Sequence, residues 1–141
     1  MAQGAGRDVT GACHCGGVGF AVRVDFASAR RCNCSICRMR GAVAVSTPLD
    51  DFRLTRGEDL LTLYTFNSGE AKHYFCSVCG IYTHHRRRSD PAQYGVNVAC
   101  IEGVSPFDFA EVVVNEGVLH PNDGGGGVAG VLRYFPSPKA G

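Results

Sequence analysis

Hydrophobic and polar residues alternate with a period of two near the start of the chain. Apolar side chains lie at every second position, at Val18, Phe20, Val22 and Val24, and the residues between them are small or charged. Side chains of a β-strand point alternately to its two faces, so this pattern predicts a strand with one face in the core.

Shorter apolar runs follow along the rest of the chain. They cover residues 42–45, 52–54, 60–66, 73–75, 81–84, 94–99 and 109–114. Residues that favour turns separate these runs, as in Asn67-Ser68-Gly69. The best helix candidates are residues 35–40 and 106–109, each about one turn long. Many short strands divided by turns predict an all-β, mostly antiparallel fold with very little helix.

The two ends of the chain lack this pattern. Residues 1–8 are expected to form a flexible lead-in. Gly124–Gly127, followed by Pro136 and Pro138, indicate a flexible, poorly ordered stretch over residues 122–141. A chain of 141 residues is long enough to bury one core, so residues 9–121 are expected to form a single domain.

Composition narrows the class of protein. A hydrophobic content of 45% and a charged content of 19% are typical of a soluble globular chain. No apolar run is long enough for a transmembrane helix, and the first residues lack the plan of a secretion signal, so a cytoplasmic location is expected. The net charge of +1 gives no reason to expect a nucleic-acid partner. Twelve of the fourteen basic residues are arginine, which suits a small acidic ligand.

Cysteine is the most informative residue type. Seven of the eight cysteines fall into three clusters, which are Cys13 and Cys15, then Cys32, Cys34 and Cys37, then Cys76 and Cys79. The cytosol is reducing, so clustered thiols there indicate metal binding rather than disulfides. Structural zinc takes four protein ligands, whereas catalytic zinc takes three and keeps one position open. Seven thiols therefore suggest one closed site and one open site.

The two outer pairs suit the closed site. Cys76-x2-Cys79 is followed by Gly80, and Cys13-x-Cys15 by Gly16, which permits the tight turn of a metal knuckle. Other four-cysteine partitions stay open, but this one leaves the triplet whole. A rubredoxin-like iron centre would need a matching second Cys-x2-Cys doublet in place of Cys13-x-Cys15.

The triplet Cys32, Cys34 and Cys37 suits the open site. Zinc with three thiolates carries a net charge of −1 and is a poor Lewis acid. It is better suited to holding a ligand thiol as a nucleophilic thiolate than to making hydroxide.

The remaining candidates each keep more than one interpretation. Cys100 is a core cysteine, a fourth ligand of the triplet, or a residue that acts beside the ligands or in redox chemistry. His73 is a strand histidine or a group that orients a ligand or acts as an acid–base. His84, His85 and Arg86–Arg88 form a solvated basic loop or a clamp for the carboxylates of an acidic thiol. Arg38 and Arg40, beside the triplet, have the same two interpretations, and His14 is expected to point to solvent.

Three cysteine motifs in this order resemble a known family. The segments 11–18 (GACHCGGV), 32–38 (CNCSICR) and 73–82 (HYFCSVCGIY) resemble the glutathione-dependent formaldehyde-activating enzyme (GFA) family, which includes the centromere protein V domain. The resemblance runs from about Val9 to Pro121. Residues 122–141 match no motif of the family.

The resemblance implies a β-tent fold built from antiparallel sheets. It implies a structural zinc at Cys13, Cys15, Cys76 and Cys79 and a catalytic zinc at Cys32, Cys34 and Cys37. The implied reaction is that of a carbon–sulfur lyase, in which glutathione and formaldehyde give S-hydroxymethylglutathione, with a small thiol and an aldehyde as partners. The alternative is a non-catalytic, zinc-stabilised binding module of the same fold.

Overall fold

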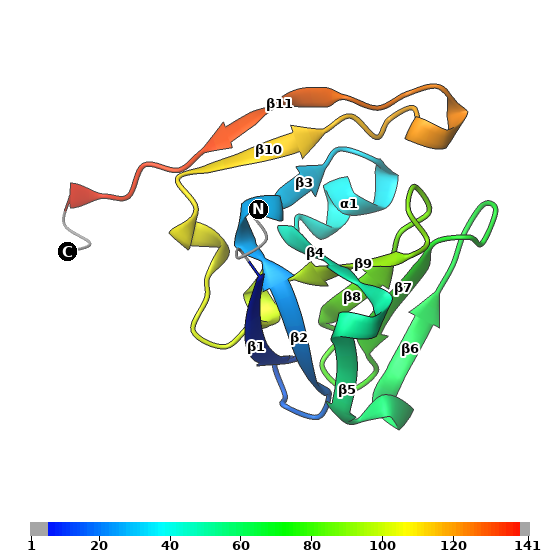
Figure 1. The fold of residues 1–141 in the computed structure, drawn as a ribbon, viewed down its shortest axis with the longest axis vertical. Helices are drawn as coiled ribbons and strands as arrows, with labels where there is room; N and C mark the ends of the chain where they lie inside the picture. Colours follow the sequence, from blue (N-terminus) through cyan, green and yellow to red (C-terminus); the bar gives the residue numbers. More distant parts are fainter. Residues whose placement is uncertain (1–5, 139–141) are drawn as a thin grey trace.

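The computed structural model describes residues 6–138, whose regular secondary structure is mostly β-strand (Figure 1). The strands are β1 (Gly6–Ala12), β2 (Gly19–Asp25), β3 (Arg30–Cys32), β4 (Ala44–Pro48), β5 (Phe52–Arg56), β6 (Leu61–Tyr64), β7 (Lys72–Cys76), β8 (Tyr82–Arg86), β9 (Gln93–Asn97), β10 (Glu111–Asn115) and β11 (Val128–Arg133). One short helix, α1 (Ser35–Arg40), lies where the sequence predicts it. No helix among residues 6–138 is long and apolar enough to cross a bilayer.

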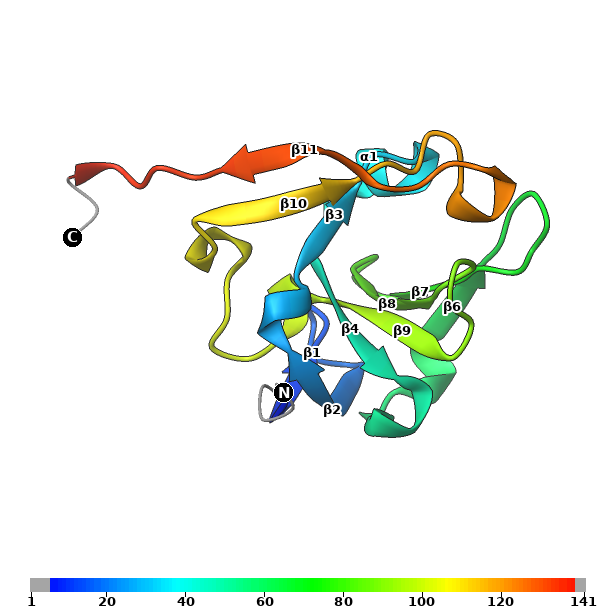
Figure 2. The ribbon, with the colours of Figure 1, turned by 45° about the horizontal axis from the view of Figure 1, so that its top comes forward.

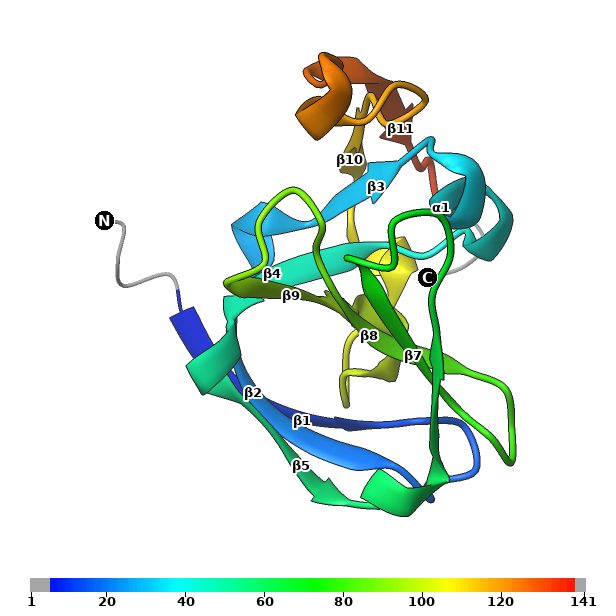
Figure 3. The ribbon, with the colours of Figure 1, turned by 90° about the vertical axis from the view of Figure 1, so that its right-hand side faces the viewer.

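The strands form two sheets. The smaller has the order β1-β2-β5, and the larger has the order β11-β10-β3-β4-β9-β8-β7-β6. All paired neighbours are antiparallel except β3 and β10, which run parallel. Figure 3 shows the smaller sheet on one side and β7, β8 and β9 on the other. The prediction of an all-β, mostly antiparallel tent with very little helix is confirmed.

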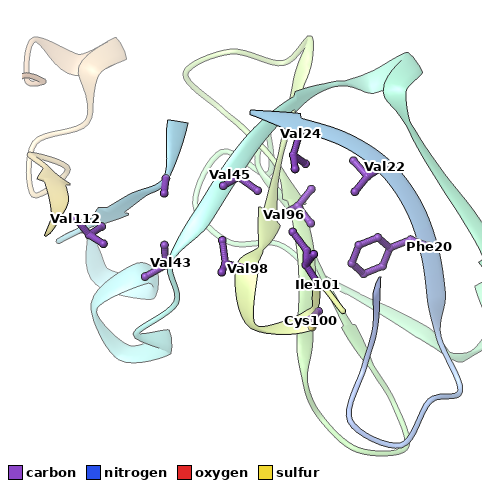
Figure 4. Close-up of a cluster of buried hydrophobic side chains, with 11 residues drawn as sticks. Phe20, Val22, Val24, Val43, Val45, Val96, Val98, Cys100, Ile101 and Val112 are labelled. Atoms are coloured by element: carbon purple, nitrogen blue, oxygen red, sulfur yellow. The ribbon is translucent and has the colours of Figure 1, made fainter. Parts of the chain in front are cut away.

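The core lies between the two sheets. Phe20, Val22 and Val24 on β2 are almost fully buried (Figure 4). They belong to one cluster with Val45 and Val96 of the larger sheet and with Val98, which follows β9. The Phe20 ring stacks on Phe52 of β5, with ring centroids 5.2 Å apart. Burying each such side chain contributes about 1.5–3 kcal/mol. The alternation on β2 is therefore the core-facing pattern that the sequence predicts.

The sequence indicates no strand at the positions of β1, β3 and β11. Strand β1 begins at Gly6 and pairs along its whole length with β2, so residues 6–8 are not a loose lead-in. Strand β11 pairs with β10 inside the stretch that was expected to lack order. Strands β1 and β11 are both edge strands without a fully buried residue, so burial imposes no clear alternation on their sequences. Figure 2 shows the β10–β11 ribbon beside β3, at one edge of the larger sheet. Residues 1–5 and 139–141 lie outside the described part of the chain.

Candidate functional site

Four cysteines gather where the turn after β1 meets the turn after β7. The sulfurs of Cys13, Cys15, Cys76 and Cys79 all lie within 4.8 Å of one another. The Cys15 Sγ atom is 3.6 Å from Cys13 Sγ and 3.7 Å from Cys76 Sγ. Cys13 and Cys76 are buried. The cluster joins the smaller sheet to the larger one.

Backbone geometry prepares this cluster for anionic sulfur. The Val18 N–H donates to Cys13 Sγ at 3.3 Å, and the Val78 N–H donates to Cys76 Sγ at the same distance. Such donors stabilise thiolates. Gly80 closes its turn with φ +78° and donates its N–H to the Cys76 carbonyl at 2.8 Å. Four sulfurs with backbone donors fit a closed tetrahedral metal site.

The other three cysteines lie at the junction of β3 and α1. Cys32 ends β3, Cys34 precedes the first residue of α1, and Cys37 lies in the first turn of the helix. Their sulfurs also lie within 4.8 Å of one another. Parallel pairing of β3 with β10 sets Cys32 opposite Asn115, so the chain after β10 passes directly beside the trio.

Gly117 fills the space behind this trio. Its N–H donates to the Asn33 side-chain oxygen at 2.7 Å, which fixes the backbone there. A Cβ atom at Gly117 would lie 2.4 Å from Cys32 Sγ and 3.0 Å from the Cys34 Cβ atom. No side chain fits at this position unless the cysteines move.

The charge properties of the trio favour a bound cation. The pKa of the Cys34 thiol is lowered, chiefly because the thiols of Cys32 and Cys37 donate to its sulfur, and the pKa of Cys37 is raised for the same reason. Three thiolates this close repel one another, so they ionise together only when a cation neutralises them. The described residues offer this group no fourth metal-ligating side chain. The donor set fits zinc with one position left for a ligand.

A cavity of about 350 Å³ opens beside the three cysteines. Its walls include arginine and histidine side chains from several strands and from α1, namely Arg30, Arg31, Arg40, His73, His85, Arg87 and Arg88. The acidic groups in its lining are Glu116 and Asp123. Five arginines against two carboxylates give the cavity a positive charge.

The structure shows which of the basic candidates line the cavity and which do not. The cavity is lined by Arg40, Arg87 and Arg88 but not by Arg38. Arg86 lies at the surface, where its Nε–H donates to the Pro91 carbonyl. Arg88 is neutralised by ion pairs at 3.0 Å to Glu70 and Asp123. The basic segment from His84 to Arg88, which the sequence suggested as a loop, is therefore partly strand, because β8 extends to Arg86.

The structure also shows where the other histidine and cysteine candidates lie. His84 is buried among aromatic rings, with Phe52 4.3 Å and Tyr74 4.7 Å away between ring centroids. His14 is exposed. Cys100 is buried in the core, with its thiol 3.5 Å from the Tyr82 carbonyl. The interpretation of Cys100 as a fourth ligand of the triplet is therefore wrong.

Sequence reasoning did not identify Arg31 or Gly117. Arg31 directly precedes Cys32, and this adjacency could have indicated that Arg31 lies at the site. Gly117 lies 80 residues after Cys37, and only the pairing of β3 with β10 brings it to the site.

Comparison with known proteins agrees with this geometry. The chain is similar to a Rhodobacter sphaeroides protein of known crystal structure, with 57% sequence identity and a TM-score of 0.72. That match covers 73% of this chain and 96% of the other. The family described as "Glutathione-dependent formaldehyde-activating enzyme" matches residues 8–114, which include all seven clustered cysteines. The chain therefore belongs to the GFA family.

Proposed function

We propose that this protein is a zinc-dependent enzyme of the carbon–sulfur lyase type. It joins a thiol such as glutathione to a small aldehyde such as formaldehyde and forms S-hydroxymethylglutathione. The observation that carries the proposal is a three-cysteine group that opens onto a positively charged cavity. Glutathione belongs to the reducing interior of the cell, so we place the protein in the cytoplasm.

The two cysteine groups would hold two zinc ions in different ways. Cys13, Cys15, Cys76 and Cys79 would enclose a structural ion that contributes folding energy. Cys32, Cys34 and Cys37 would hold the second, which would keep a substrate thiol in its thiolate form near neutral pH. The thiolate sulfur attacks the carbonyl carbon, a C–S bond forms, and the C=O π electrons move to oxygen. That oxygen takes up one proton, which balances the proton released by the thiol.

Arg87 is the best candidate to bind a glutathione carboxylate. One terminal nitrogen of its guanidinium donates to the Ser46 hydroxyl at 2.9 Å, which fixes the group on the cavity wall. Its Nε atom is buried and has no hydrogen-bond partner among the described residues. Arg88 already pairs with two carboxylates, so Arg87 is the more available charge.

The rate of thiol addition tests the proposal. Exchange NMR with ¹³C-formaldehyde and glutathione measures formation of the adduct above the spontaneous rate. We expect the wild type to accelerate exchange and Cys34→Ser to fall to the spontaneous rate while it stays folded with about one zinc ion.

Cys100→Ala is the matched control, because it removes a buried thiol outside both groups. It should keep two zinc ions and the activity. A two-zinc wild type that neither binds glutathione nor accelerates exchange would contradict the proposal and favour the binding module.

A further inference from the structure

His73 lies in a stack of aromatic rings on the cavity wall. Its ring is parallel to within 23° with both neighbours, Phe66 at 5.6 Å and His85 at 5.5 Å between ring centroids. The pairing of β7 with β8 sets His73 directly opposite His85. The side chain is 94% buried, so its ring orientation is fixed by packing.

Arg40 determines which nitrogen of His73 carries the proton. The guanidinium of Arg40 lies 3.1 Å from His73 Nδ1 and can only donate hydrogen bonds. His73 Nδ1 must therefore be the acceptor, and the proton of the neutral ring is on Nε2. The same guanidinium is 3.6 Å from Cys37 Sγ and 3.7 Å above the Tyr82 ring, so it is held on three sides.

The Nε2–H group of His73 has no acceptor within the described part of the chain. The Nε2 atom is buried and has no hydrogen-bond partner among residues 6–138. A buried donor without a partner is unfavourable, because it has given up its hydrogen bonds to water. Burial and the charge of Arg40 lower the pKa of His73 to about 4, so the ring stays neutral at physiological pH. Bulk water does not contact the atom, so an acceptor reaches it only when a ligand enters and neighbouring side chains adjust.

We propose that His73 is a catalytic residue whose Nε2–H donates a hydrogen bond to the aldehyde oxygen, and that Arg40 is the positioning residue that fixes this tautomer. The inference rests on the proposed thiol addition, and it is carried by the place of His73 in the same cavity lining as the three cysteines.

The hydrogen bond strengthens as the reaction proceeds. When the C–S bond forms, the carbonyl oxygen becomes an alkoxide, which accepts a hydrogen bond more strongly than the aldehyde does. His73 keeps its proton throughout, and the alkoxide takes its proton from water. A neutral imidazole N–H polarises a substrate carbonyl in other enzymes.

Two substitutions of His73 distinguish the effect of its N–H donor from the effect of its aromatic ring. His73→Phe keeps an aromatic ring in the stack and removes the N–H. We expect kcat to fall about 10²–10³-fold, the usual effect of losing one such donor, with the KM for glutathione little changed. His73→Gln places an amide N–H near the Nε2 position and should recover most of this loss. Both variants should retain two zinc ions.

Nitrogen-15 NMR of the zinc-loaded protein gives a test independent of activity. The ring of His73 should show a protonated Nε2 and an unprotonated Nδ1, and Arg40→Met should abolish this fixed preference. Two results would overturn the role of His73 and leave the thiol addition standing. One is a proton on Nδ1, and the other is a wild type that accelerates exchange together with a His73→Phe variant that is equally active. An inactive wild type would overturn both.

Discussion

Gly117→Ala adds one methyl group behind the three cysteines and should remove one of the two proposed metal sites. The new Cβ atom would lie 2.4 Å from Cys32 Sγ, whereas ordinary contacts of a Cβ atom begin near 3.4 Å. The sulfur or the strand beneath it must therefore move by about 1 Å. Zinc–sulfur distances in proteins hold to about ±0.2 Å of 2.3 Å, so the displacement is about five times the tolerance.

The substitution should not harm the fold elsewhere. The φ angle of Gly117 is not in the left-handed region, so alanine adopts the same backbone without strain. We expect the variant to bind one zinc ion normally and to lose affinity for the second by at least about 10²-fold.

Elemental analysis and zinc release to a chromogenic chelator measure this loss. Gly130→Ala, on β11, is the matched control, because a Cβ atom there meets nothing within 4 Å. It should keep two zinc ions. If Gly117→Ala also keeps two ions with unchanged release, the account of how Cys32 and Cys34 are held is wrong.

Two further predictions concern stability. Cys76→Ser removes a buried thiol of the four-cysteine group, which joins the two sheets. If this group holds a structural zinc ion as proposed, the variant should lose cooperative unfolding in calorimetry, and a sharp transition with two zinc ions would contradict this. Burial lowers the pKa of His84 to about 4, below its unfolded value of 6.5, so the unfolded chain binds more protons as pH falls and stability declines through this range. His84→Phe removes that proton site, so its free energy of unfolding relative to wild type should rise by about 2 kcal/mol between about pH 7.5 and about pH 5. Denaturant titrations at the two pH values measure the change, and a constant difference would refute it.

The sequence predicts those features that burial or chemistry imposes on neighbouring residues. The alternation on β2 follows from one buried face, and α1 lies at the predicted residues 35–40. The cysteine spacing suggests four plus three thiols, and the sulfurs gather in groups of four and three.

Features set by long-range register could not be predicted in this way. Gly117 reaches Cys32 only through the parallel pairing of β3 with β10. The stack of His73 on His85 depends on the register of β7 against β8, and Phe66 joins it from the chain after β6. Strands β1 and β11 are sheet edges without a fully buried residue, so no continuous apolar face marks them.

Zinc X-ray absorption, recorded before and after addition of glutathione, tests the open position at Cys32, Cys34 and Cys37 most directly. Seven cysteine sulfurs shared by two ions give a mean of about 3.5 sulfur ligands per zinc. One thiolate from glutathione should raise the mean to about 4. A mean that does not change with glutathione, or that is already 4 without it, would contradict an open site that accepts a substrate thiol.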